Sequence, residues 1–312
     1  MAIPDGLQAQ RRLGPDWADW LDRLPRLVET LLREWELTVT GPPMHGFASI
    51  VVPVVVSNAP TTALADGGAA VLKIGFDGAD DTAQEPLALQ LWDGDGAVRM
   101  YRAAPARRAM LLERLGSENL NGEEDVQACE IVAGFYPRLH VPAPPRLRRL
   151  SDVLTGWLDD MAADAAAMPV PRRMVDQALS LGRDFAADPD CDGKVVHGDL
   201  HYENVLSADR APWLVIDPQP MSGDPHYEPA PLLWNRWDEM DGYLRESIRR
   251  RLHTVVDVAG LDADRARDWV TVRMVVNAHW SVEDARRMHR PLDASERDWI
   301  TRCVSIVKAV QD

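Results

Sequence analysis

The chain has 312 residues, of which 46% are hydrophobic and 27% charged, as expected for one large globular domain or two moderate ones. Its 34 basic and 49 acidic residues give a net charge of −15, which argues against a general nucleic-acid-binding protein and permits a cationic ligand. Three dispersed cysteines predict a reducing, cytoplasmic setting without disulfides, and the sequence shows neither a signal peptide nor an apolar run near the ~20 residues of a membrane span.

The first third of the chain predicts a helical segment followed by a small antiparallel sheet. Apolar residues at helical spacing predict a helix over residues 16–37, which Pro25 should break or kink into two. Residues 81–92 also predict a helix, with Thr82 as a plausible N-cap, although Pro86 would suit the start of a helix better. Short apolar or β-branched runs, punctuated by Gly, Pro, Asn and Asp, predict strands at 47–56, 69–76, 98–103 and 109–114.

After Gly116 the pattern is mostly helical, with a break at residues 194–217, where two short runs resemble strands. A Pro-rich connector covers residues 141–146. The predicted helices lie at residues 123–140, 151–166, 172–187, 227–240, 242–258, 262–286 and 294–310. The chain is therefore predicted to be an α+β protein with two lobes, an N-terminal lobe over residues 1–113 and a larger helical lobe over residues 114–312.

Several catalytic motifs are absent from the sequence. It contains no GxxxxGK[ST] phosphate loop, no GxSxG, no HExxH and no complete GxGxxG. P-loop NTPases are therefore excluded, and a dinucleotide fingerprint is not supported.

The most informative segment is VVHGDLHYENVLSADRAPWLVID, residues 195–217. Asn204 follows Asp199 by five residues and Asp217 ends the second strand-like run, which is the spacing of the kinase pattern H-x-D-L-x-x-x-N with a later metal-binding Asp. In this interpretation Asp199 orients the acceptor hydroxyl and takes its proton, His197 braces the catalytic loop, and Asn204 and Asp217 offer hard oxygen ligands to Mg²⁺. Asp217-Pro218-Gln219 stands where protein kinases have Asp-Phe-Gly, which favours a small-molecule kinase.

The segments HGDLHYENVL and IDPQPMSGDP resemble the aminoglycoside phosphotransferase superfamily, in particular its streptomycin 6-phosphotransferase and hydroxyurea phosphotransferase branch. The resemblance extends from about Pro4 to Ser281. It implies a two-lobe fold like that of eukaryotic protein kinases, with ATP and Mg²⁺ as cofactors.

The resemblance also implies nucleotide-binding residues in the first lobe. Lys73 is one of only three lysines in the chain, and the resemblance implies that it contacts the α- and β-phosphates. Glu85 would then pair with the Lys73 ammonium group. The simpler interpretations are that Lys73 lies on the surface of an edge strand and that Glu85 interacts with the dipole at the start of a helix. The segment from Gly46 to Ser49 is the candidate phosphate loop, with the Ser49 hydroxyl as a ligand, although it could be an ordinary turn. Backbone groups of Glu113 and Leu115 would pair with the adenine edge.

The residues that would bind the acceptor are marked by no single motif. Carboxylates and tryptophans of the second lobe could bind ammonium or guanidinium groups by charge-assisted hydrogen bonds and stacking, but they could also be solvated faces and core residues. Asp224 and Glu228 belong to a GDP-x-x-E segment that could instead only buttress the catalytic loop. The candidate substrate residues are Asp224, Glu228, Trp234, Asp238, Trp280 and Glu283.

We therefore expect an ATP- and Mg²⁺-dependent O-phosphotransferase with a small cationic acceptor, most plausibly streptomycin, modified at its 6-hydroxyl as an antibiotic-resistance reaction. Hydroxyurea or another small metabolite is the alternative acceptor. A metal-dependent hydrolase using His197 and His201 is the alternative from another class, and a nucleotide-binding pseudokinase is disfavoured because the catalytic residues are all present. We expect a monomer or weak dimer, with no nucleic-acid or membrane partner.

Overall fold

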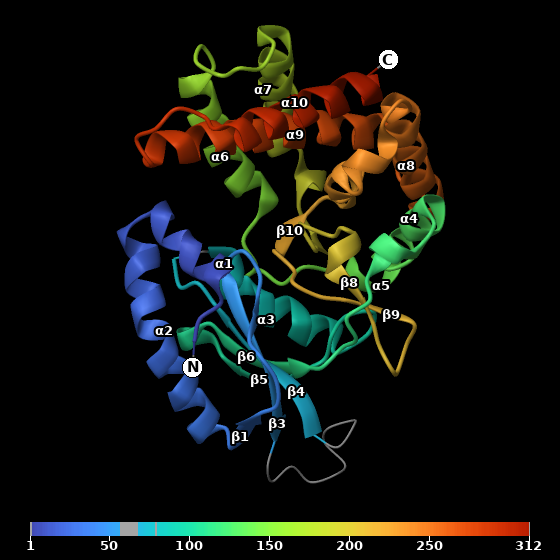
Figure 1. Cartoon of the computed structure of the whole chain (residues 1–312). Helices are drawn as coiled ribbons and strands as arrows, with labels where there is room; N and C mark the ends of the chain where they lie inside the picture. Colours follow the sequence, from blue (N-terminus) through green and yellow to red (C-terminus); the bar gives the residue numbers. More distant parts are fainter. Residues whose placement is uncertain (1, 57–67, 79, 312) are drawn as a thin grey trace. The chain divides into compact units, whose positions relative to one another are not determined.

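The computed structural model describes residues 2–56, 68–78 and 80–311 (Figure 1). The chain forms two compact units: Met1–Gly116 with Ala208–Pro212, and Ser117–Ser207 with Trp213–Asp312. A sheet dominates the first unit and helices dominate the second, which confirms the predicted α+β class. In the part of the chain that is described, no helix is both long and apolar enough for a membrane span.

The first unit is built on an antiparallel sheet in the strand order β1-β3-β4-β6-β5, with β2 paired to β3. Its strands are β1 (Leu37–Val39), β2 (Met44–His45), β3 (Ser49–Val56), β4 (Ala69–Gly75), β5 (Met100–Ala104) and β6 (Ala109–Glu113). Its helices are α1 (Asp5–Gln8), α2 (Pro15–Glu34) and α3 (Asp80–Trp92), with 3₁₀ turns η1 (Ala9–Leu13) and η3 (Pro105–Arg107). The β1 and β2 strands, three and two residues long, are too short to produce a period in the sequence.

Helix α2 packs one apolar face against one face of the sheet, where alternate residues of β3 and β4 are buried. The helix continues through Pro25, so the prediction that Pro25 divides it in two was wrong. Proline removes one backbone hydrogen bond, but buried leucines precede it and Val28 and Leu31 continue the same buried face after it. Packing on both sides of the proline therefore keeps the helix in one piece.

Helix α3 begins at Asp80 and contains Pro86 in its interior. The expectation that Thr82 caps this helix was therefore wrong, as was a start at Pro86. The Thr82 hydroxyl instead donates a hydrogen bond to the Phe76 carbonyl oxygen at 2.8 Å. That bond links the first turn of α3 to the residue that follows β4.

The second unit is mainly helical, with two two-stranded sheets. Its longer helices are α4 (Asp125–Ala133), α6 (Leu150–Asp164), α7 (Arg172–Ala187), α8 (Leu244–Ala259), α9 (Ala263–Arg287) and α10 (Ala294–Gln311), with a short α5 (Tyr136–Leu139). The strands are β7 (Lys194–Val196), β8 (Val205–Ser207), β9 (Trp213–Val215) and β10 (Met221–Gly223), paired as β7 with β10 and β8 with β9. Short 3₁₀ turns are η4 (Leu120–Gly122), η5 (Pro189–Cys191), η6 (Tyr202–Asn204), η7 (Pro225–Tyr227), η8 (Ala230–Trp234) and η9 (Trp237–Met240).

Helix α9 is the central element of the second unit (Figure 1). Every residue from Trp269 to His279 is buried, as expected for a helix with neighbours on all sides. The helices predicted at 151–166, 172–187, 242–258, 262–286 and 294–310 are confirmed within two residues at each end.

Two other helix predictions in this unit were wrong. Residues 227–240 form 3₁₀ turns in place of an α-helix, because Pro229 and Pro231 lack the N–H groups that a continuous helix requires. The helix expected at 123–140 is interrupted between α4 and α5, which begins with Pro137 in its first turn.

All three cysteines are free and buried in the core. Burial raises the pKa of Cys129 to about 11 and those of Cys191 and Cys303 to about 12. The three thiols are therefore protonated and unreactive in the folded protein.

Arg210 ties residues 208–212 to the rest of the first unit. Its guanidinium donates hydrogen bonds to both oxygens of the buried Glu113 carboxylate, at 2.8 and 3.1 Å from Nε, and to the carbonyl oxygens of Gly94 and Ala97. Glu113 also accepts the Arg99 N–H at 3.0 Å. Asn204 and Asp217, the two predicted metal ligands, flank the β8–β9 hairpin, and residues 208–212 connect its two strands. The Arg210–Glu113 ion pair therefore holds the connection between the two strands.

Replacing Arg210 by Met should therefore lower the free energy of unfolding by about 2 kcal/mol or more, because the Glu113 carboxylate would stay buried without its partner. The matched control is Arg107→Met, since Arg107 pairs with Glu34 at the surface and such pairs contribute less than about 1 kcal/mol. Urea unfolding of both variants measures the difference. Equal losses would show that Glu113 does not depend on Arg210.

Candidate active site

The β8–β9 hairpin places the two predicted metal ligands on neighbouring strands. Val205 pairs with Val215, and the Ile216 N–H donates to the Asn204 carbonyl oxygen at 2.9 Å. Asn204 therefore lies across from Ile216, one residue before Asp217. Asp217 adopts a left-handed backbone conformation with φ of 57°, which is uncommon for residues other than glycine and turns the chain sharply out of the strand.

The catalytic loop is held through its backbone. The ring of His197 is fully buried; its Nε2 donates to the Ile216 carbonyl oxygen at 2.9 Å, and its Nδ1 accepts the Asp199 N–H at 3.2 Å. Burial lowers the pKa of His197, so the ring is neutral and its two nitrogens keep these separate roles. One carboxylate oxygen of Glu228 accepts the Gly198 N–H at 2.8 Å.

The Asp199 side chain is 25% exposed and has three polar neighbours in the second unit. Gln219 Nε2 lies 3.3 Å from its Oδ2, His201 Nε2 lies 3.8 Å from the same oxygen, and Arg273 Nη2 lies 3.9 Å from its Oδ1. The Asn204 amide donates to the Asp199 carbonyl oxygen at 2.8 Å. The predicted catalytic residues His197, Asp199 and Asn204 are thus joined in one hydrogen-bonded group.

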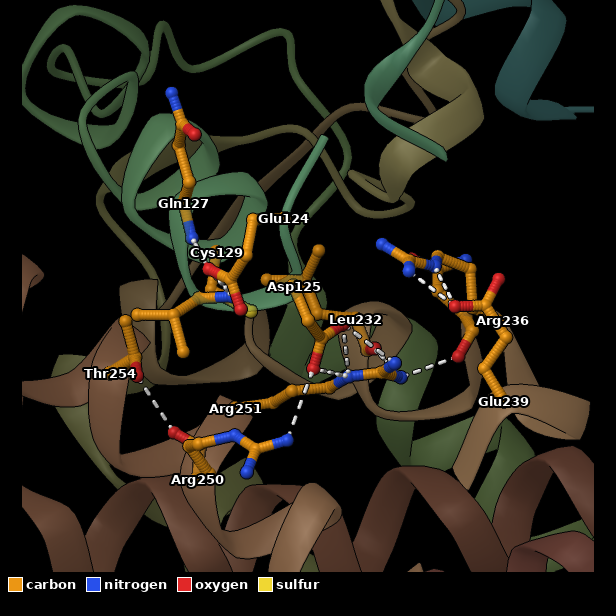
Figure 2. Close-up of polar contacts among 12 residues, drawn as sticks. Glu124, Asp125, Gln127, Cys129, Leu232, Arg236, Glu239, Arg250, Arg251 and Thr254 are labelled. Carbon is orange, nitrogen blue, oxygen red and sulfur yellow. Dashed lines mark hydrogen bonds and ion pairs between the residues drawn. The ribbon is translucent and has the colours of Figure 1, made fainter. Parts of the chain in front are cut away.

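A second anchor fixes the loop beyond Asp199. The Tyr202 hydroxyl contacts the Asp125 carboxylate at 3.1 Å, and its backbone N–H donates to Asn235 Oδ1 at 3.1 Å. Arg251, which is 2% exposed, joins both partners, because it pairs with Asp125 and donates to the Asn235 carbonyl oxygen. Figure 2 shows the Arg251 guanidinium aligned with the Asp125 carboxylate.

In the first unit, Lys73 and Glu85 form a buried ion pair. The Lys73 ammonium lies 2.6 and 2.8 Å from the two Glu85 oxygens, and the two residues are 6% and 2% exposed. Lys73 points away from the core that α2 shares with the sheet because it alternates with the buried Leu72 and Ile74 on β4.

The other predicted nucleotide residues also belong to this sheet. Ser49 is buried at the first position of β3, where it pairs with Gly75. Leu115 is half-buried, two residues after the end of β6. Glu113 ends β6, and its side chain is the ion-pair partner of Arg210.

The structure divides the predicted acceptor residues into two groups. Asp224 and Glu228 are 2% and 0% exposed. The Asp224 carboxylate contacts His226, Arg265 and Trp269, each at 2.6 Å. Burial therefore leaves Asp224 and Glu228 almost no exposed side-chain surface for a substrate.

Trp280 and Glu283 contact other residues of the helices. Trp280 packs edge-on against Trp157 of α6, with ring centroids 5.1 Å apart. Glu283 pairs with Arg287 at 3.2 Å on the same helix. Neither residue lines the cavity that adjoins the catalytic loop.

That cavity has a volume of about 480 Å³ and reaches the catalytic loop through His201. Two of the predicted acceptor residues, Trp234 and Asp238, line it. The remaining lining residues are mainly polar or charged: Asn121, His201, Glu203, Asn235, Arg236, Trp237, Glu239 and Arg302.

The cavity has an excess of negative charge. Arg236 pairs with Glu239, and Arg302 pairs with Asp298 outside the cavity at 2.8 Å. Glu203 accepts a hydrogen bond from Asn121 Nδ2 at 3.3 Å, but among the residues described by the structure no ion pair engages Glu203 or Asp238. These two carboxylates can therefore contact a cationic group directly.

Asn204 and Asp217 provide a donor set that fits Mg²⁺. The Asn204 amide nitrogen is used on the Asp199 carbonyl oxygen, so the amide oxygen is left for a cation. An amide oxygen and a carboxylate are hard ligands of the kind that Mg²⁺ selects. The described residues contain no group of three His, Cys, Asp or Glu side chains arranged to hold a metal, and His197 is engaged with Ile216 and Asp199, so the structure gives no support to the hydrolase hypothesis.

Three residues near the catalytic loop were missed in the sequence. Arg273 gives a signal in retrospect, as a single basic residue within the apolar stretch WVTVRMVV of residues 269–276. Gln219 follows Asp217 by two residues, but only the folded chain shows its contact with Asp199. Glu203 lies inside the motif and reads there as an ordinary polar spacer.

The fold and these groups define a kinase: a buried Lys–Glu pair in a sheet-based unit, and an Asp with two metal-ligand candidates in a helical unit. Residues 34–285 match the family described as aminoglycoside/hydroxyurea antibiotic resistance kinase. The chain belongs to this family and is a phosphotransferase.

Two characterised relatives and one solved structure illustrate the similarity. The chain is 38% identical over 291 residues to streptomycin 6-kinase of Streptomyces glaucescens, covering 90% of this chain and 91% of that protein. It is also 38% identical over 273 residues to hydroxyurea phosphotransferase of Kitasatospora aureofaciens, covering 85% and 75%. The crystal structure of a thermostable aminoglycoside phosphotransferase APH(4)-Ia variant, in ternary complex with ADP and hygromycin B, shares the fold with a TM-score of 0.56, 16% identity, and coverage of 91% and 98%.

Gly198 should not tolerate a side chain. Its φ is +83°, and an added Cβ would lie 2.4 Å from the Gln219 carbonyl oxygen. Gly198→Ala should therefore destabilise the protein by about 1–3 kcal/mol and abolish most of its activity, because the backbone before Asp199 must move. The matched control is Gly156→Ala, at an exposed site on α6 with open space around it. This substitution should be neutral or should stabilise the protein by up to about 1 kcal/mol. Thermal unfolding and turnover measure both, and a Gly198→Ala protein of normal stability and activity would contradict the constraint.

Proposed function

We propose that this kinase transfers the γ-phosphoryl group of ATP to a hydroxyl of streptomycin, at the 6-position named for its relative in Streptomyces glaucescens. The observation that carries the acceptor class is the cavity beside the catalytic loop, where no described ion pair engages Glu203 or Asp238. A volume of about 480 Å³ is typical of sites for drug-sized ligands. It suits an aminoglycoside better than hydroxyurea, which remains the alternative because a hydroxyurea phosphotransferase is equally similar in sequence.

Asp199 is the residue we propose to act on the acceptor. Its carboxylate orients the attacking hydroxyl and receives the proton as the new phosphate ester bond forms. Gln219 and His201, both close to Oδ2, limit the rotation of the carboxylate. Positioning contributes much of the rate in phosphoryl transfer, since the reacting groups must lie in line.

In the first unit, Lys73 would contact the α- and β-phosphates of ATP, with its ammonium held by Glu85. ADP in the structure of the APH(4)-Ia variant supports a nucleotide as donor. Asn204 and Asp217 would hold Mg²⁺, which when bound neutralises charge on the phosphates. Ser49 and the backbone of Glu113 and Leu115 remain our proposed contacts to the phosphates and the adenine.

Unpaired carboxylates in the cavity favour a cationic acceptor. Glu203 and Asp238 can form charge-assisted hydrogen bonds with guanidinium or ammonium groups, and Trp234 lines the cavity beside them with an aromatic ring. The proposed complex therefore needs no rearrangement of the ion pairs that involve Arg236 and Arg302.

Asp199→Asn should lower kcat for streptomycin phosphorylation by about 10²–10⁴-fold while the protein stays folded, because the amide cannot take the proton. Asp190→Asn, at an exposed position of η5, is the control and should behave as wild type. ADP formation, followed with streptomycin, other aminoglycosides and hydroxyurea in parallel, gives the measurement. Turnover of hydroxyurea alone would disprove the streptomycin assignment, and full activity of Asp199→Asn would disprove the role of Asp199.

Glu203→Gln and Asp238→Asn should each raise KM for streptomycin by roughly tenfold or more, because each removes one charge-assisted hydrogen bond to the cation. KM for ATP should not change. Glu246→Gln, an exposed carboxylate of α8 outside the cavity, is the control. If both cavity variants keep the wild-type KM for streptomycin, the acceptor binds elsewhere.

A further inference from the structure

Arg273 is a buried cation at the centre of the second unit. It lies on α9, is 6% exposed, and is surrounded along the helix by Val270, Val272 and Met274. Burying a guanidinium costs several kcal/mol unless its charge and donors are satisfied, so a single arginine at this position requires a compensating partner.

The partner of Arg273 is the peptide immediately before Asp199. Arg273 Nη2 donates to the Gly198 carbonyl oxygen at 2.5 Å, and the N–H of the same peptide, on Asp199, donates to His197 Nδ1 at 3.2 Å. This peptide plane is therefore held at both ends. The preceding peptide is held in the same way, because the Gly198 N–H donates to Glu228 and the Gln219 N–H donates to the His197 carbonyl oxygen.

The charge of Arg273 also faces the Asp199 carboxylate, with Nη2 3.9 Å from Oδ1. Its guanidinium carbon lies 4.2 Å from the centre of the Tyr227 ring, which supports the cation from the other side. Nε and Nη1 have no hydrogen-bond partner within the described residues. The hydrogen bond that Arg273 makes therefore goes to the catalytic loop, and two of its nitrogens remain without a partner in the described residues.

The buried Arg251 provides the contrast. It is as deeply buried as Arg273, but its guanidinium is used on Asp125 and on two carbonyl oxygens. That arrangement accounts for the burial of Arg251 by structural bonds alone. The burial of Arg273 has no such explanation, because its Nε and Nη1 form no hydrogen bond within the described residues.

We propose that Arg273 is a positioning residue for phosphoryl transfer: it fixes the Gly198–Asp199 peptide and orients the Asp199 carboxylate toward the acceptor. This inference rests on the proposed role of Asp199. A guanidinium is required because it must reach the Gly198 carbonyl oxygen while its carbon stays 4.2 Å from the centre of the Tyr227 ring. A lysine supplies the charge without this fixed geometry.

The test compares Arg273→Met, Arg273→Lys and Arg273→Ala. Arg273→Met should lower kcat by about 10²-fold, as for the loss of one preorganised donor, with KM for ATP and streptomycin within about threefold of wild type. Arg273→Lys should have a kcat between those of Arg273→Met and the wild type. Low concentrations of guanidinium ion should restore activity of Arg273→Ala in a saturable way, which a purely structural role would not produce.

Arg286→Met is the control, because Arg286 lies on the same helix, is largely exposed and pairs with Asp164. It should keep the wild-type kcat and show no response to guanidinium. Guanidinium should also fail to restore Asp199→Asn. The inference is overturned if kcat of the Arg273 variants falls only in proportion to the folded fraction in thermal unfolding, or if guanidinium restores nothing. Wild-type turnover in the same assay separates failure of this inference from failure of the proposed function.

Discussion

The backbone conformation at Gly198 is the constraint on which the catalytic arrangement depends. A φ of +83° turns the chain between His197 and Asp199, and the Gln219 carbonyl oxygen occupies the space that a Cβ would need. Four hydrogen bonds, from or to His197, Gln219, Glu228 and Arg273, then fix the peptides on both sides of the glycine. Glycine alone supplies the turn at low cost, and the four bonds make the turn unique.

Polar contacts replace regular secondary structure around the catalytic residues. Strands of three residues and single 3₁₀ turns cannot hold a loop by their own hydrogen bonds, so buried charges from α8 and α9 hold it. Burial raises the pKa of the Glu228 carboxyl, but His140 and the Gly198 N–H outweigh this effect and hold the pKa below its ordinary value. Glu228 is therefore ionised where it holds the loop. The neighbouring cavity follows the opposite pattern, since no ion pair within the described residues engages two of its carboxylates, Glu203 and Asp238.

The parts of the protein that sequence patterns predicted are those set by local spacing. Helical periodicity located α6 to α10 closely, and the spacing of Asp199, Asn204 and Asp217 indicated the kinase chemistry. The wrong helix predictions at Pro25 and at residues 227–240 share one cause, because the effect of a proline depends on its neighbours in space. Packing on both sides of Pro25 keeps α2 continuous, whereas Pro229 and Pro231 prevent an α-helix in their segment. The pairing of Lys73 with Glu85, implied by resemblance, is present in the structure at 2.6 Å.

The sequence by itself determined the family, the class of reaction and the residues that we propose to perform it, because these depend on residue types at short, fixed spacings along one segment. Tertiary structure alone decided which residues support that segment and which line the neighbouring cavity. Arg273 is 75 positions from Gly198 along the chain and Arg210 is 97 from Glu113, and no local pattern links partners at such distances. Asp224 and Asp238 were both candidate substrate residues in the sequence. Burial of the first among His226, Arg265 and Trp269 and exposure of the second in a cavity separate them, because only packing decides whether a carboxylate is paired inside the protein or left for a ligand.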